Sequence, residues 1–161
     1  MMRFVTLARD QRGAAMIELA FIAPVLALLT VGVVDLSNGF GTKLRVEQAA
    51  QRSIEKVMQT TGVLTVEDTI AAEAVCQYNG TLPNGNCKTA PLTTADVVVT
   101  HRLECNNVVT TDPDCTAGQK EARWIQVTVS TDYTPMFPLK FSGIAANGKY
   151  HIVSVAGMRT E

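Results

Sequence analysis

The sequence predicts an α+β protein in which a long N-terminal helix precedes a small antiparallel-sheet domain. Three observations lead to this prediction: an uncharged apolar run over residues 19–34, helical periodicity that continues to residue 58, and three strand-like runs nearer the C-terminus. A helical part followed by a group of strands is typical of the α+β class. The length that remains after the apolar N-terminal segment suits one domain with a modest core.

The N-terminal apolar segment is long enough to cross a bilayer. Residues 14–34 form an apolar stretch whose one charge is Glu18. About 20 helical residues, at a rise of 1.5 Å each, span roughly 30 Å, the thickness of a bilayer core. Over residues 1–13, arginines outnumber acidic residues. This positive excess predicts a cytoplasmic N-terminus and export of the rest of the chain.

Three interpretations of this segment compete. A secretory signal peptide needs a small-x-small cleavage site after the apolar run, and residues 33–37 offer none that is convincing. A plain membrane anchor gains nothing from Glu18, because such a charge costs about 2.5–3.5 kcal/mol at a bilayer centre. A leader cut after Gly13 would make Ala14 the new N-terminus, and an α-amino group near Glu18 would offset part of that cost. We favour the third interpretation.

The start of the apolar helix reads RGAAMIELAF over residues 12–21, with Pro24 inside it and Val-Val-Asp at residues 33–35. This pattern resembles the TadE-like minor pilins (pseudopilins) of tight-adherence, or Flp-type, type IV pilus systems. Residues 44–52 and a C-terminal Tyr-Thr-Pro loop, short strand and closing arginine are also similar to that family. The major pilin of these systems has tyrosine after the glutamate and is much shorter, so Leu19 and the chain length favour a minor pilin.

The resemblance implies cleavage by a prepilin peptidase between Gly13 and Ala14, with Glu18 as the acidic residue used in assembly. A helix whose first half is apolar all round and whose second half has one apolar stripe predicts a pilin-like lollipop fold. The expected parts are a cytoplasmic leader over residues 1–13, a transmembrane helix over 14–35, an amphipathic continuation of the helix over 36–61 and a periplasmic α+β head over 62–161.

The function implied by the resemblance is assembly of a Tad/Flp-type adhesive pilus, through priming, at the tip or by regulation. The implied partners are the inner membrane, the prepilin peptidase, other pilins and pseudopilins of the same system, and the pilus assembly platform. The protein would stay in the inner membrane as a single-pass protein or enter a surface pilus. An alternative is an uncleaved, membrane-anchored periplasmic module that binds a ligand or acts as an enzyme.

Within the helix, Pro24 lacks a backbone N–H and should bend the helix, although transmembrane helices also tolerate proline. Beyond residue 35, the helical periodicity predicts one apolar face that packs against the head, and Gly62 is a plausible end of the helix. The residues predicted for that face are Leu36, Phe40, Ala50, Ile54, Val57 and Met58, flanked by Leu44 and Val46.

The head is expected to contain a helix over about residues 66–77, introduced by a capping box at Thr65 and Asp68. Strands are expected over residues 96–104, 122–133 and 149–158. Within the second of these strands, Trp124 alternates with the apolar positions and shares a face with polar residues.

Four cysteines lie in the predicted head, at Cys76, Cys87, Cys105 and Cys115. They allow three pairings, and local pairing would close two turn-rich loops with bonds that each contribute about 2–4 kcal/mol. Buried thiols are the alternative, but an exported head faces an oxidising compartment. A zinc site fits less well because the sequence has no C-x-x-C pair.

We expect neither catalysis nor a bound metal or cofactor. His101 and His151 are solitary, and no nucleophile or phosphate-loop motif accompanies them. The net charge of -1 provides no basic field for nucleic acid. An apolar loop over residues 136–141 either contacts a partner or, as is more common, covers the core.

Overall fold

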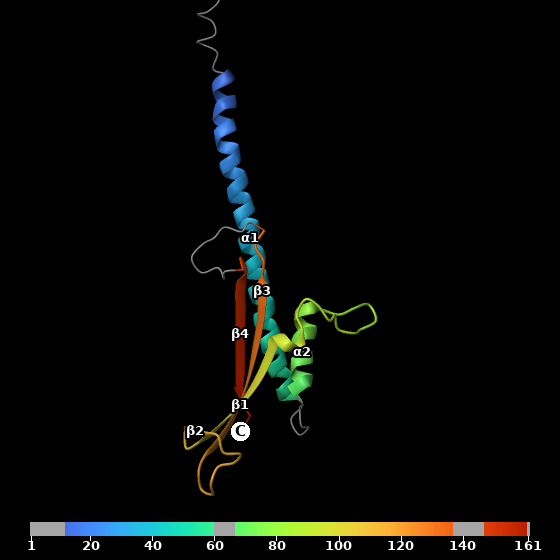
Figure 1. The fold of residues 1–161 in the computed structure, drawn as a ribbon, viewed down its shortest axis with the longest axis vertical. Helices are drawn as coiled ribbons and strands as arrows, with labels where there is room; N and C mark the ends of the chain where they lie inside the picture. Colours follow the sequence, from blue (N-terminus) through green and yellow to red (C-terminus); the bar gives the residue numbers. More distant parts are fainter. Residues whose placement is uncertain (1–11, 60–66, 137–146, 161) are drawn as a thin grey trace, which may run out of the picture. The chain divides into compact units, whose positions relative to one another are not determined.

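The computed structural model describes residues 12–59, 67–136 and 147–160. The elements in chain order are α1 (Arg12–Gln59), α2 (Glu67–Asn79), the 3-10 helix η2 (Thr94–Asp96), β1 (Val97–Cys105), β2 (Val108–Thr110), β3 (Glu121–Tyr133) and β4 (Tyr150–Arg159) (Figure 1). The predicted α+β class is confirmed, with a long N-terminal helix followed by a small antiparallel sheet. Between Asn38 and Gly39 the chain divides into two compact units.

The first unit contains, in its described part, the segment of α1 that ends at Asn38. Nearly all of its large apolar side chains are exposed, and Phe21, at 74% exposure, is the extreme case. Pro24 lies inside the helix, which is assigned without a break on both sides of it. A bend at Pro24 therefore stays a prediction.

The second unit is built on a sheet of order β2-β1-β3-β4, in which every neighbouring pair is antiparallel. The long strand β3 pairs along its length with β1 on one side and β4 on the other. Because side chains alternate across a strand, Ile125, Val127 and Val129 share one face of β3 and are buried. The predicted strands are confirmed to within one or two residues.

The short strand β2 was not predicted from the sequence. It pairs with the end of β1 through a two-residue turn, in which Asn106 and Asn107 have φ angles of 52° and 66°. Two consecutive positive φ angles match the type I′ turn, whose twist suits a hairpin and which favours asparagine. The Asn-Asn pair was therefore the signal in the sequence for this hairpin.

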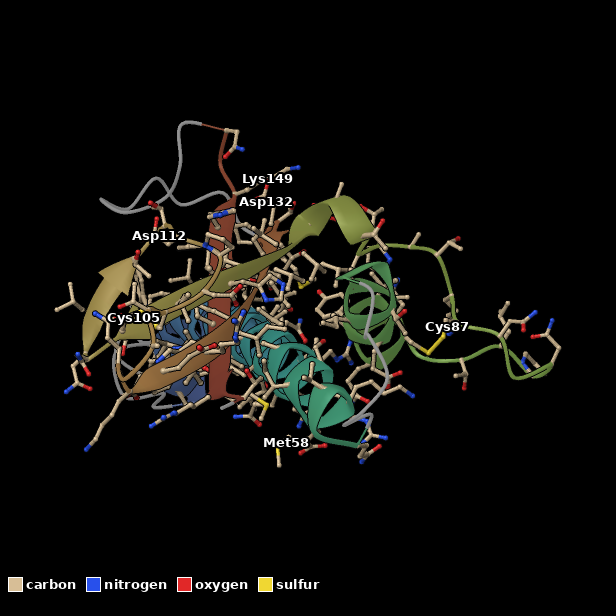
Figure 2. All side chains as sticks on the ribbon, turned by 90° about the horizontal axis from the view of Figure 1, so that it is seen from below. Met58, Cys87, Cys105, Asp112, Asp132 and Lys149 are labelled. Atoms are coloured by element: carbon tan, nitrogen blue, oxygen red, sulfur yellow. A yellow bond between two sulfur atoms is a disulfide. The ribbon has the colours of Figure 1, made fainter. Side chains whose placement is uncertain are left out.

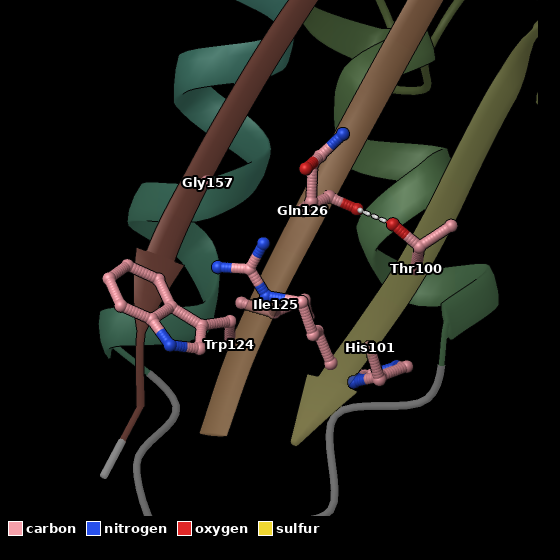
Figure 3. A pocket seen from close by; sticks show the side chains of 7 residues that line it. Thr100, His101, Trp124, Ile125, Gln126 and Gly157 are labelled. Atoms are coloured by element: carbon pink, nitrogen blue, oxygen red, sulfur yellow. Dashed lines mark hydrogen bonds between the residues drawn. The ribbon is translucent and has the colours of Figure 1, made fainter. Parts of the chain in front are cut away.

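The core of the second unit lies between one face of the sheet and the two helices, α2 and the part of α1 that begins at Gly39. Figure 3 shows both helices on the same side of strands β1, β3 and β4. Ser53 is the buried polar residue of this core, and its hydroxyl donates to the Ala49 carbonyl at 2.9 Å. The buried core residues are Val46, Ala49, Ala50, Ile54, Ile70, Ala71, Ala74, Val75, Leu92, Val97, Ile125, Val127 and Val129.

The buried face of α1 differs from the predicted apolar face. Ala50 and Ile54 are buried and Val57 packs against the core, but Leu36, Phe40, Leu44 and Met58 are exposed. At 100° per residue, Phe40 and Met58 lie about 120° around the helix from the fully buried Val46. The buried side of α1 combines the small residues Ala49, Ala50 and Ser53 with Val46 and Ile54. Figure 2 shows Met58 pointing away from the strands.

Both predicted local disulfides are present. Cys76 bonds to Cys87 with a Cα–Cα distance of 4.8 Å, and Cys105 bonds to Cys115 with a Cα–Cα distance of 5.6 Å. The first bond ties α2 to the loop that follows it, and the second ties the end of β1 to the loop between β2 and β3 (Figure 2). All four cysteines are thereby used.

Several sequence predictions fall outside the described residues. They are most of the leader over residues 1–13, the helix end at Gly62, the capping residue Thr65 and most of the apolar loop over residues 136–141. The predicted boundary between residues 61 and 62 lies in the same undescribed part of the chain.

Candidate functional site

The predicted cleavage site and Glu18 lie in the first turns of α1. Gly13 and Ala14 are exposed helical residues, and Glu18 follows Gly13 by five residues, about 7.5 Å along the helix axis. A Cβ atom added at Gly13 would meet nothing within 4 Å. Neither the packing of this chain nor a positive φ angle therefore requires glycine at this position.

Glu18 is exposed and makes no ion pair or hydrogen bond with any residue that the structure describes. Its nearest neighbours on the helix face are apolar, since Ala14, Ala15, Phe21 and Ile22 stand three and four positions away. A carboxylate in such surroundings is costly when the helix enters a bilayer. Any partner that compensates its charge has to be sought outside the described part of this chain.

The apolar surface around Glu18 is that of a membrane segment. Within the described residues, α1 is the helix that is long and apolar enough to span a bilayer, judged by length and composition. None of its most apolar window is buried inside the protein. A soluble core helix would hide such a surface, so α1 is a candidate membrane anchor.

The two histidines named from the sequence do not come together. His151 lies on β4, and its Nδ1 atom lies 2.9 Å from the Asp132 carboxylate on β3, directly across the register. His101 lies on β1 and is exposed. No three His, Cys, Asp or Glu side chains of the described ranges form a group that could hold a metal ion.

The loop closed by the Cys105–Cys115 bond is also held by charge. Arg123 on β3 donates to the carboxylate of Asp114, at 2.6 Å, and to that of Glu121. The hydrogen bond to Asp114 and then that to Glu121 raise the pKa of the Arg123 guanidinium. This loop is therefore fixed to the sheet by both a covalent and an ionic link.

The sheet has one face that neither helix covers in the described structure, and sequence reasoning did not identify a site there. The even-numbered residues of β3 face this side, including Trp124 and Gln126. Val98 and Val155 are 53% and 55% exposed on the same face. The signal in the sequence for a site on this face was Trp124, a large aromatic residue among the polar positions of an alternating strand.

An exposed apolar helix followed by a disulfide-bonded α+β domain defines a candidate single-span membrane protein. Residues 13–54 match the family model described as TadE-like protein, and this match confirms the resemblance noted at the start of the helix. Over these residues the chain is therefore similar to TadE-like proteins. The matched segment lies within α1, so the sheet is outside it. No curated protein and no solved structure matches the chain.

Proposed function

We propose that this chain is a minor pilin, or pseudopilin, that takes part in the assembly of a Tad/Flp-type adhesive pilus. Prepilin peptidase cuts it between Gly13 and Ala14, residues 14–35 hold it in the inner membrane, and the head faces the periplasm. Its role is structural, through lateral contacts with other pilins and with the assembly platform, and it needs no catalytic group, metal or cofactor. Some copies enter the surface pilus.

The observation that carries this proposal is the carboxylate of Glu18, which pairs with no described residue and lies on an apolar helix surface. A carboxylate without a compensating positive group raises the free energy of a helix in the bilayer, and a positive group on another chain would offset that increase. The N-terminal amino group created by cleavage after Gly13 is such a partner, on the same chain or on a neighbouring pilin. The family match supports the same conclusion because it begins at Gly13.

The disulfides support export of the head. Disulfides persist in oxidising compartments such as the periplasm and are rare in the cytosol. Both bonds of this chain lie in the unit after Gly39, on the C-terminal side of the candidate membrane anchor. This location agrees with a cytoplasmic N-terminus and a periplasmic head.

The processing step is tested by replacing Gly13 with leucine and determining the N-terminus and intact mass of the membrane-bound protein. Gly32→Leu is the matched control, because an added Cβ meets nothing within 4 Å at either glycine and both lie in α1. We expect the Gly13→Leu protein to keep residues 1–13 and the Gly32→Leu protein to begin at Ala14. A normal N-terminus in the Gly13→Leu protein would contradict the proposal and favour an uncleaved anchored module.

A further inference from the structure

A hollow of about 470 Å³ opens on the helix-free face of the sheet (Figure 3). Its volume lies in the range of small-ligand sites, about 300–1,000 Å³. Thr100, Gln126 and Gly157 form one row across β1, β3 and β4, and Arg102 and Trp124 lie in the next row. The residues that line the hollow are Thr100, His101, Arg102, Trp124, Ile125, Gln126 and Gly157.

The hollow exists because Gly157 carries no side chain between its neighbours. A Cβ atom there would stand 3.2 Å from the Ile125 carbonyl oxygen and 3.8 Å from the Gln126 Cα atom. Even alanine would therefore be tight, and a larger side chain would occupy the space. Glycine in the interior of a strand often marks a place where a ligand or another backbone approaches closely.

One wall of the hollow is the indole of Trp124. Its Nε1 atom is buried and has no hydrogen-bond partner among the described residues, so the indole presents mainly carbon atoms to the hollow. The Arg102 guanidinium carbon lies 5.4 Å from the centre of the ring, within the distance of a cation–π contact. The part of the indole that Arg102 leaves uncovered therefore suits stacking and not hydrogen bonding.

The rim is polar but carries little net charge. Arg102 pairs with Glu104 at 2.8 Å, and Glu104 compensates its charge while other guanidinium N–H groups remain for a ligand. The Gln126 side-chain amide bonds no residue that the structure describes. The Thr100 hydroxyl makes only a long contact, 3.5 Å, with the Gln126 carbonyl. The rim thus offers donors and acceptors to neutral polar groups.

We propose that this hollow binds a neutral sugar ring of a polysaccharide. A pyranose has a face of C–H groups that stacks on an indole and a border of hydroxyl groups that fit guanidinium, amide and hydroxyl partners. A sugar carboxylate would compete with Glu104 for Arg102, so an uncharged sugar fits better. This binding activity goes beyond the proposed assembly role and uses a different part of the chain.

The test uses the intrinsic fluorescence of Trp124, which is the one tryptophan of the sequence. The full-length chain is placed in lipid nanodiscs and titrated with cellotetraose. Maltoside detergents are avoided because their sugar headgroups would compete for the site. We expect a saturable blue shift with half-saturation at about 1 mM, a weak affinity that suits a shallow site with few contacts. Tetragalacturonate, a charged sugar oligomer of equal length, should bind more weakly.

Two variants locate the binding. Gln126→Ala and Arg102→Met should each weaken cellotetraose binding about tenfold, since each removes hydrogen bonds to the ligand. Gln77→Ala, the same substitution at an exposed position of α2, should leave binding unchanged. Isothermal titration calorimetry of the same samples checks each affinity independently of the emission of Trp124.

Four results would overturn the proposal. They are the absence of saturable binding at about ten times the expected half-saturation concentration, equal binding by the Gln126→Ala and Gln77→Ala proteins, tighter binding of tetragalacturonate than of cellotetraose, and a concentration-dependent shift of the sugar-free protein. The last result would mean that a second copy of the chain covers this face. None of these results bears on cleavage after Gly13, so this proposal and the proposed function fail separately.

Discussion

Removal of the disulfide between Cys76 and Cys87 should lower the free energy of unfolding of the head without changing its fold. The bond closes a loop with a sequence separation of 11 residues. The loop-closure relation then gives about 2.8 kcal/mol at 25 °C. The native loop keeps other anchors, because the Asn79 side chain donates to the carbonyls of Lys88 and Leu92 and accepts from the Leu92 N–H. Leu92 itself is buried.

The assay is urea unfolding of the Cys76→Ala/Cys87→Ala chain in lipid nanodiscs, followed by the emission of Trp124 on β3. We expect a lower midpoint that corresponds to a loss of about 2–3 kcal/mol. The folded emission spectrum should match that of the unchanged chain, because the substitutions are remote from β3. A matched comparison is the Cys105→Ala/Cys115→Ala chain, whose loop separation of 10 residues predicts nearly the same entropic loss.

A loss below about 1 kcal/mol would refute the loop-closure reasoning for the first bond. A changed folded spectrum would refute the other part, that the fold of the head around β3 is unchanged. The second bond carries an additional expectation. Cys105 is a buried residue, so its replacement also removes packing, and a loss larger than that of the first variant would measure that packing.

Three further expectations follow from single positions. Glu18→Val should leave membrane insertion and cleavage normal but reduce the number of surface pili, counted together with the amount of processed protein. An apolar helix inserts more readily, whereas the charged contact that sets the register of the helix is lost. Normal piliation would show that Glu18 has no role in assembly. Ser53→Ala should change the free energy of unfolding by less than about 1 kcal/mol, whereas Ser53→Leu should lower it by about 1–3 kcal/mol through overpacking. Equal urea midpoints for the two proteins would contradict a tightly packed core around this residue. Arg123→Met should lower the melting temperature of the head by an amount that is constant between about pH 7 and pH 10. Because the pKa of the guanidinium is raised in the folded state, its contribution to stability is fully present below the unfolded-state pKa and is lost only at higher pH. A difference in melting temperature between the two proteins that shrinks within this interval would contradict the interpretation.

The parts of the fold that the sequence could predict depend on local signals. The apolar helix, the alternating strands and the local cysteine pairs each have a pattern within a few consecutive residues. The side of α1 that packs on the sheet depends instead on tertiary contacts. Hydrophobicity favoured Phe40 and Met58, which are exposed, whereas the small residues Ala49 and Ser53 are fully buried.

The hollow was not predictable for a similar reason. It depends on Gly157 and Trp124, which are far apart in sequence and are brought together by the register between β3 and β4. The strand alternation placed Trp124 on the polar face but gave no information on its neighbour in the next strand. Gly13 and Glu18, in contrast, are separated by less than two helical turns, so their spacing could be read directly from the sequence.

The two proposed activities reside in different units and should therefore be separable. Glu18 belongs to the unit that ends at Asn38, and Gln126 belongs to the unit that begins at Gly39. Residues without shared partners usually act additively. A Glu18→Val chain should then bind cellotetraose as the unchanged chain does, and a Gln126→Ala chain should be cut after Gly13 and support normal piliation. If Gln126→Ala also reduced piliation, the uncovered sheet face would be an assembly contact between pilins, and its Trp124 hollow would be better explained by a protein partner than by a sugar.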